Sequence, residues 1–177
     1  GESSGAYMAT GVNFPDALAA GPAASLYQYP IVLENGQSAT LSAGTMDLLG
    51  DLGVTRVTIA GGPNSFGSAL ESGLASAAGI PEVHRAWGAD RYSAGQAINQ
   101  EFRLADTVFL ATGQKFPDAL AGAALAGASG APLYLVQPDC VPVGVLQDIA
   151  RRFPAQIILL GGPATLSYNV EQLVPCS

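Results

Sequence analysis

The chain has 177 residues, of which 49% are hydrophobic and only 12% charged, and its mean hydropathy is +0.30. This composition supplies a sizeable apolar core, which argues against intrinsic disorder and fits one large domain or two small ones. Seven cationic and fourteen acidic side chains give a formal net charge of −7. The basic surface that nucleic-acid binding requires is therefore missing, and we expect no nucleic-acid partner.

Short apolar runs alternate with helical patterns along the chain. Strands are predicted at residues 6–10, 30–33, 56–60 and 107–111, and helices at residues 15–27, 43–52, 66–78 and 90–102. Buried strands that are separated by helices pair in parallel through right-handed crossovers. The expected fold class is α/β, with open, mostly parallel sheets flanked by helices on both faces, as in Rossmann-like and toprim-like folds.

The uncharged stretch at residues 119–136 is long enough to cross a membrane. It is rich in Gly and Ala and is interrupted by Pro132, and a more polar counterpart lies earlier in the chain. We therefore predict a buried helix that leads into a buried strand, and no membrane span.

The sequence repeats itself. The segments at residues 9–11 (ATG) and 14–19 (FPDALA) recur 102 residues later, and the Gly-Gly-Pro at residues 61–63 recurs 100 residues later. Agreement over separate landmarks indicates a tandem repeat of about 100 residues, the size of a small domain.

The repeat divides the chain into an incomplete first copy at residues 1–85 and a complete second copy at residues 86–177. The second copy has a helical pattern at residues 87–102 ahead of its ATG segment, and nothing equivalent precedes Ala6. Either the chain is a fragment of a longer array or its modules are permuted across the boundary, and we favour the fragment.

Two kinds of loop follow predicted strands, where open α/β sheets bind ligands. In the first kind, Asp16 and Asp118 fall near a helix N-terminus, so each can be a helix cap or a ligand contact. In the second kind, Gly61 and Gly161 can make a tight turn or admit an anion. Because neither phosphate-binding glycine motif is present, we favour the tight turn.

Catalytic and metal-binding patterns are sparse. His84 is the only histidine, which excludes sites with several histidines, and no G-x-S-x-G nucleophile motif occurs. We expect no metal and no cofactor. A carboxylate pair made by Asp16 and Asp118 is the one feature that favours a hydrolase. Asp90 and Arg91 precede an apolar helix face and are predicted to form a buried polar feature.

Cys140 and Cys176 are the two cysteines. They would be free thiols in a reducing compartment and a disulfide in a secreted protein. The scarcity of lysine and the acidic isoelectric point fit secretion, so we predict the disulfide. It would close a loop of about 37 residues and contribute about 3–4 kcal/mol in the chain-entropy model.

The order of the motifs resembles the type 2 cell-wall-binding repeat of surface proteins from Gram-positive bacteria. The G-x-D-R-Y element of that family appears at residues 88–92, its F-P-D-A-L element appears in both copies, and its late Gly-Gly strand end does too. The resemblance covers nearly the whole chain.

The resemblance implies an extracellular, non-catalytic module that anchors a larger protein to the cell wall. The implied partner is an anionic wall polymer, either teichoic-acid-like or a secondary wall polysaccharide. Together with the two strand-end aspartates, the candidate ligand-binding residues lie around the family's arginine and along two strands: Asp16, Asp90, Arg91, Tyr92, Asp118, Pro30, Ile31, Leu33, Pro132, Leu133 and Leu135.

Two features depart from a simple polyanion-binding repeat. Tyr134 interrupts the second apolar strand, and the net charge of −7 opposes a polyanion unless arginines are locally concentrated. Two alternatives follow. The chain can be a structural module for packing between repeats or in a homo-oligomer, or it can be a cell-wall hydrolase.

Overall fold

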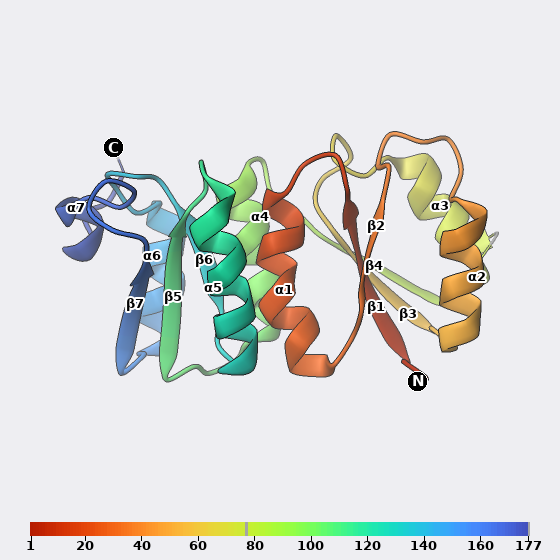
Figure 1. Ribbon diagram of the computed structural model, residues 1–177, viewed down its shortest axis with the longest axis horizontal. Coiled ribbons are helices and arrows are strands. Elements are labelled where there is room, and N and C mark those ends of the chain that lie inside the picture. The colour runs from red at the N-terminus through yellow and green to blue at the C-terminus, as the bar shows by residue number, and fades with distance from the viewer. Residues whose placement is uncertain (77, 177) are drawn as a thin grey trace.

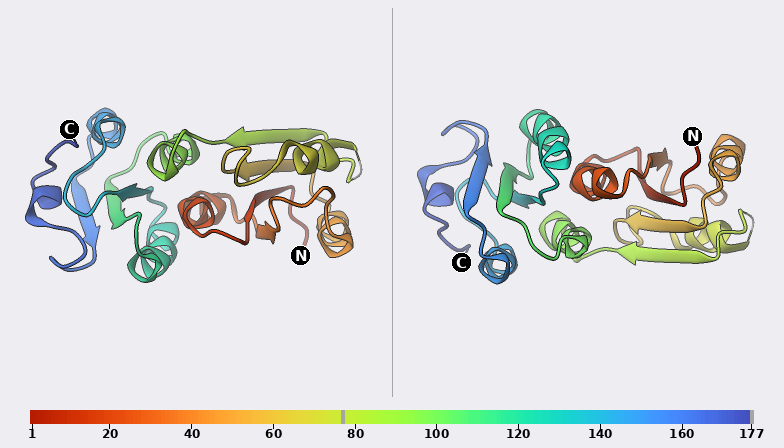
Figure 2. Two further views of the ribbon diagram at one scale, coloured as in Figure 1. Left: turned by 90° about the horizontal axis from the view of Figure 1, so that it is seen from above. Right: turned by 90° about the horizontal axis from the view of Figure 1, so that it is seen from below.

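Two parallel β-sheets lie in opposite halves of an elongated molecule, with a layer of helices between them and further helices on their outer sides (Figures 1 and 2). The computed structural model describes residues 1–76 and 78–176. The first sheet has the strand order β2 (Ile31–Glu34), β1 (Gly5–Thr10), β3 (Arg56–Ala60) and β4 (Glu82–Ala86). The second has the order β6 (Leu133–Val136), β5 (Thr107–Thr112) and β7 (Gln156–Leu160). Every strand pair is parallel, which confirms the predicted α/β class.

The helices are α1 (Pro15–Tyr27), α2 (Ala43–Leu52), α3 (Ser68–Ser76), α4 (Arg91–Ile98), α5 (Phe116–Ala128), α6 (Val143–Arg152) and the short α7 (Tyr168–Glu171). A 3₁₀ turn, Asn99–Glu101, continues α4, so the single helix predicted at residues 90–102 was too long. The helix predicted at 66–78 was also too long, and its residue 77 lies outside the described residues. The uncharged stretch forms α5 and β6, as predicted, and no helix in the described part of the chain is long and apolar enough to span a membrane.

Strand β4 was missed by the sequence analysis. Three of its five residues, Glu82, His84 and Arg85, are polar, so it lacks the apolar run of a buried parallel strand. At the sheet edge these polar residues are stabilised by ion pairs. Arg56 binds Glu82 at 2.7 Å and Arg85 binds Glu71 at 2.8 Å. The first sheet ends at Ala86, one residue past the predicted division of the repeats.

Helices α1 and α5, which carry the two F-P-D-A-L elements, pack side by side between the sheets (Figure 2). The contact is close because small residues line it. A Cβ atom placed on Gly21 would lie 3.3 Å from the Cβ of Ala123, and one placed on Gly127 would lie 2.8 Å from the Cβ of Ser25. Helix α4 packs on α1, on α6 and on β6, so it joins the two sheets. The abundance of Gly and Ala in these elements therefore reflects close helix packing.

The predicted disulfide, Cys140–Cys176, is present. It ties the segment after α7 to the loop after β6. Val141 lies beside it and forms two backbone hydrogen bonds there. Its N–H donates to the carbonyl of Val174 at 2.8 Å, and its carbonyl accepts from the N–H of Cys176 at 3.0 Å. The cross-link thus fixes the C-terminal segment against the second sheet.

Replacing both cysteines by serine is expected to lower the free energy of unfolding by about 3–4 kcal/mol, because the open chain gains loop entropy when it unfolds. Urea unfolding of the two oxidised proteins measures the difference. A reductant should destabilise the wild type by a similar amount and leave the double variant unchanged. Equal stability of the variant and the wild type would contradict the expectation.

Candidate functional site

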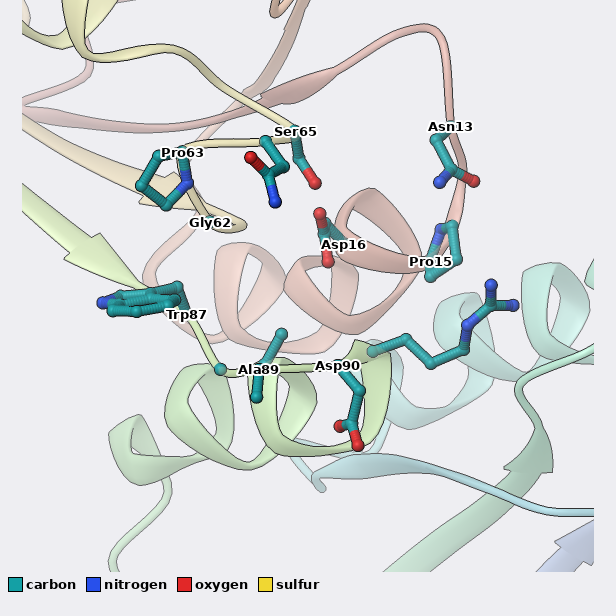
Figure 3. Close-up of a pocket in the computed structure, with 13 residues that line it drawn as sticks. Asn13, Pro15, Asp16, Gly62, Pro63, Ser65, Trp87, Ala89 and Asp90 are labelled. Carbon is teal, nitrogen blue, oxygen red and sulfur yellow. The ribbon is translucent and has the colours of Figure 1, made fainter.

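A pocket of about 360 Å³ opens at the carboxyl ends of β1, β3 and β4, where α1 and α4 begin. Figure 3 shows its lining, which comes from three stretches: the turn before α1, the Gly-Gly-Pro loop after β3, and the segment between β4 and α4. This is the position at which open parallel sheets bind ligands. Because the last of these stretches leads into the helix that joins both sheets, the pocket lies near the junction of the two copies.

Asp16 is the buried acid of this pocket, with 9% of its surface exposed. Its carboxyl group points toward Ser65 (Figure 3), which hydrogen-bonds to it. Gly61, at φ 115°, passes so close that a Cβ atom at this position would collide with the Asp16 carboxylate. Burial raises the pKa of Asp16, and the Ser65 hydroxyl and the charge of Arg91 only partly oppose this. The pocket therefore holds a carboxylate that is poorly solvated.

The capping interpretation of the two strand-end aspartates is wrong in its details. Phe14 is the N-cap of α1 and Lys115 is the N-cap of α5, and neither contributes a side-chain capping hydrogen bond. Asp16 lies in the first helical turn, where the helix dipole favours a negative charge, but its side chain interacts with the loop after β3. The side chain is thus directed into the pocket.

Asp16→Asn is expected to raise the stability of the free protein near neutral pH. A carboxyl whose pKa is raised on folding stabilises the fold when it is protonated, and that stabilisation is lost as the pH rises through the folded-state pKa. The melting temperature of the variant should therefore exceed that of the wild type at pH 7, and the difference should shrink at acidic pH. Asp118→Asn, in the second copy, is the matched control. A lower melting temperature for Asp16→Asn at pH 7 would contradict this reasoning.

Trp87 forms one wall of the pocket and was not among the sequence candidates. It is the only tryptophan of the chain, follows β4 directly, and is 52% exposed. Its ring lies over Gly62, where an added Cβ atom would be 3.3 Å from the ring. Figure 3 shows it across the pocket from Asn13. A half-exposed indole beside polar groups is a common feature of binding sites, and its position just before the G-x-D-R-Y element was the available signal.

Asp90 and Arg91 do not form the buried polar feature that was predicted, since Asp90 is exposed and Arg91 only half-buried. Asp90 is exposed and caps α4 in a capping box with Ser93, since its carboxylate accepts the backbone N–H of Ser93 at 2.8 Å while the Ser93 hydroxyl is 3.1 Å from the backbone nitrogen of Asp90. In Figure 3 the Asp90 carboxylate points away from Asp16. The extended backbone and polar side chain of an N-cap explain its exposure.

Arg91 is half-buried and extends from the pocket toward the second sheet, where its guanidinium donates a hydrogen bond to the carbonyl of Gly113, the residue after β5. Tyr92 lies against the same glycine, 2.9 Å from the place of an added Cβ atom, and burial raises the pKa of its phenol. Arg91 forms no ion pair with any residue of 1–76 or 78–176. Its remaining N–H donors are thus available beside the pocket.

The candidate residues on the two apolar strands differ in their burial. Leu133 and Leu135 in β6, and Pro132 just before it, are buried, so in this structure they support the fold and cannot contact a polymer. Tyr134 is equally buried, which raises its pKa to about 12. In the first copy Pro30 and Ile31 are half-buried, and Leu33 is the only candidate of this kind with an exposed side chain, at 57%. None of these residues lines the pocket beside Trp87.

The second copy repeats only part of the site. The Asp118 carboxylate lies close to Gly161, just as the Asp16 carboxylate lies close to Gly61. A Cβ atom on Gly161 would be 2.9 Å from the Asp118 carboxylate. Gly162, however, is open, and no residue of 1–76 or 78–176 takes the place that Trp87 occupies over Gly62. The structure therefore does not bring Asp16 and Asp118 into one pocket. Within the described ranges, no group of His, Cys, Asp and Glu could hold a metal ion.

Comparisons with known proteins give one family. A family model described as cell wall binding domain 2 matches residues 2–71 and 85–171. The chain is 27% identical over 171 residues to N-acetylmuramoyl-L-alanine amidase LytC of Bacillus subtilis, and 29% identical over 168 residues to the amidase enhancer of the same bacterium. These matches cover 96% and 94% of the chain but only 33% and 22% of the two relatives, so the chain spans a third or less of their length.

Solved structures agree with this. Cwp6 from Clostridium difficile has a TM-score of 0.87 and 25% sequence identity, and the match covers 98% of this chain and 28% of that one. Cwp8 from the same organism has a TM-score of 0.82, again with 25% identity, and the match covers 98% of this chain and 29% of that one. The similarity therefore extends over both sheets.

Proposed function

The chain belongs to the cell wall binding domain 2 family, and from this premise we propose that the pocket beside Trp87 and Asp16 holds a sugar unit of an anionic wall polysaccharide. As a member of this family the chain is a cell wall binding module and acts outside the cell, at its surface. An extracellular location also fits its disulfide. Beyond this family membership, the kind of polymer and the residues that contact it are our proposal.

The half-exposed indole of Trp87 is the observation that carries this proposal. The apolar face of a sugar ring can pack on an aromatic ring while the hydroxyl groups reach polar neighbours. Such neighbours line the same pocket: the Asp16 carboxylate and the side chains of Asn13, Asn64 and Ser65. They offer both acceptors and donors, as a polyhydroxylated ligand requires.

Arg91 supports an anionic ligand. It is the cationic side chain of the pocket lining, and its guanidinium gives only part of its donors to the Gly113 carbonyl. A planar guanidinium suits carboxylate and phosphate groups. Four other arginines are engaged in ion pairs within the fold: Arg56 with Glu82, Arg85 with Glu71, and both Arg151 and Arg152 with Asp148. The net charge of −7 then repels a polyanion everywhere except near such a local contact.

We also propose that the chain has no catalytic activity of its own and that the residues 1–85 and 86–177 are two copies of one repeat. A hydrolase that works through a pair of carboxylates would need a second acid near Asp16, but Asp118 lines a different hollow and Asp90 points away. The amidase named among the relatives is about three times longer than the matched region, so its activity is not transferred to this chain.

Titration of the purified chain with isolated wall polysaccharide tests the proposal, because the single tryptophan lies in the proposed site. We expect a saturable change in intrinsic fluorescence and co-sedimentation with intact walls that is lost when the secondary polymers are stripped. No reducing ends or peptides should be released. Binding to walls without any fluorescence change would place the polymer elsewhere, and release of fragments would show a hydrolase.

A further inference from the structure

The turn after β2 contains the one asparagine of the chain that is followed by glycine, Asn35-Gly36. The asparagines at positions 13, 64, 99 and 169 precede Phe, Ser, Gln and Val. A backbone nitrogen reaches the side-chain carbonyl of a preceding asparagine most easily when it belongs to glycine, because no Cβ atom shields it and the backbone turns freely. Asn35 is exposed, so water has access to its side chain.

The turn holds the Asn35 side chain over the peptide bond that would react. Its Oδ1 accepts a hydrogen bond from the N–H of Gln37 at 3.2 Å, which closes an Asx turn around the Gly36 peptide. The main-chain carbonyl of Asn35 also accepts from the N–H of Ser38 at 2.9 Å and so keeps the turn closed. The Asn35 Cγ is therefore kept near the Gly36 nitrogen, and proximity of this kind favours ring closure.

Two features of the backbone favour attack on Cγ. The N–H of Gly36 donates no hydrogen bond within residues 1–76 and 78–176, so the nitrogen has no acceptor to give up. The Gln37 N–H lies at the oxygen on which negative charge develops when the nitrogen adds to Cγ, as the donor of an oxyanion hole does. The turn thus supplies both the position and the charge stabilisation.

The second copy has the same turn without this chemistry. The N–H of Gly67 donates to the carbonyl of Gly36 at 2.8 Å, and the N–H of Ser167 donates to the carbonyl of Pro138 at 2.7 Å. Gln137 and Pro138 therefore take the places of Asn35 and Gly36. Proline has no N–H, and the longer glutamine side chain would have to close a larger ring. Only the turn of the first copy can cyclise readily.

The reactive turn supports two residues of the pocket. Gly36 packs so closely against Ser65 that a Cβ atom on the glycine would collide with the Ser65 carbonyl oxygen. The side chain of Gln37 donates to the carbonyl of Asn64 at 2.7 Å. Asn64 and Ser65 both line the pocket (Figure 3). A longer main chain at position 35 would displace Gly36 and Gln37, and with them this side of the pocket.

We propose that Asn35 deamidates spontaneously to isoaspartate, and that this modification displaces the pocket lining and weakens binding to the cell wall. The Gly36 nitrogen bonds to Cγ of Asn35, the bond from Cγ to the side-chain nitrogen breaks, and ammonia leaves with the proton of the Gly36 N–H. One water molecule then opens the succinimide. Opening at the main-chain carbonyl gives isoaspartate, whose main chain is one carbon longer, and opening at the side-chain carbonyl gives aspartate. The effect on binding rests on the proposed function, whereas the reaction does not.

Incubation of the purified full chain for several weeks at neutral pH and physiological temperature tests the reaction. Peptide mapping and labelling with an isoaspartyl methyltransferase should find isoaspartate at position 35, while Asn13, Asn64 and Asn169 keep their amides. Asn35→Gln should remain unmodified, and the glutamine at position 137 shows that this side chain fits the turn. Retention of the amide at Asn35 through the whole incubation would overturn the proposal.

Co-sedimentation with intact walls tests the consequence. The isoaspartate form, separated by anion exchange, should bind about fivefold or more weakly than the fresh chain, because hydrogen bonds of the turn are lost. Asn35→Asp is the matched control, since it carries the same new carboxylate on a main chain of normal length, and it should keep most of the affinity. Equal binding by the isoaspartate form and Asn35→Asp would overturn the proposed effect. If the fresh chain binds no walls, the proposed function fails together with this effect, and isoaspartate at position 35 would still be detected.

Discussion

Asp148→Ala is expected to lower the free energy of unfolding by about 3–5 kcal/mol, because it removes the acid of a buried ion pair and leaves its partner uncompensated. Asp148 is fully buried in α6. Arg151 contacts its carboxylate, and the guanidinium of Arg152 lies 3.9 Å away. The Tyr134 hydroxyl is 3.4 Å from the same carboxylate. No other acidic side chain of the described residues is so completely enclosed.

The effect of Asp148→Ala should extend beyond α6. Arg152 donates hydrogen bonds to the backbone carbonyls of Asn99, at 2.6 Å, and Phe102, at 2.9 Å, which end the segment that begins with α4. The buried amide of Asn99 in turn donates to the carbonyl of Leu133 in β6 at 2.8 Å. These bonds hold the α4 segment, and through it the wall of the pocket, against the second sheet.

Urea unfolding of Asp148→Ala measures the loss. Asp47→Ala is the matched control, because Asp47 lies in α2, the counterpart of α6, and is exposed there. It should change stability by no more than about 0.5 kcal/mol. A loss below about 1 kcal/mol for Asp148→Ala would mean that the arginines find other partners. A weaker affinity for walls should accompany the loss of stability.

The parts of the fold that the sequence predicted well are those governed by local patterns. Helix α1 begins at Pro15 because proline favours the first helical turn, and strand β3 was bounded correctly by its run of branched residues. The repeat then transferred these assignments to the second copy. Such signals depend on a few neighbouring residues, so they can be read without knowing the fold.

The parts that were missed depend on residues far apart in the sequence. Asp148 and Arg152 look like surface charges on an amphipathic helix, and they are buried only because α4, some fifty residues earlier, covers that face. At the counterpart of Asp148 in α2, Leu48 is 42% exposed, since no equivalent of α4 packs there. Burial of a given side chain was therefore set by the packing of α4.

The residues of the candidate site also divide into those that a local motif identified and those whose placement depends on distant parts of the chain. Arg91 was identified through its motif, and it does lie in the pocket. Leu133 and Leu135 came from the same resemblance but are buried, because helices α1, α4 and α5 pack against β6 even though it is an edge strand. Trp87 was overlooked because a single aromatic residue has no periodicity, and its role depends on Gly62 approaching from another strand end.

Trp87→Ala is expected to weaken binding to the wall polysaccharide by about 30-fold or more, the loss of about 2 kcal/mol that marks an aromatic hot spot. Half of the indole is already exposed in the free protein, so little core packing is lost and the melting temperature should change only slightly. Trp87→Phe keeps an aromatic face and should retain part of the affinity. Co-sedimentation with walls gives the affinities of all variants, including those that lack the fluorescent residue.

Tyr168→Ala is the matched control for this substitution, because Tyr168 is also an exposed aromatic residue, at 67%, but lies beside β7 at the outer end of the second sheet. It should bind walls as the wild type does. If both alanine variants lose affinity equally, general apolar contact with the wall explains binding, and the pocket is not the site. If neither does, the polymer does not touch Trp87, and Arg91→Ala becomes the remaining test of the pocket. A loss confined to Trp87→Ala would assign the sugar to the pocket between β3 and α4.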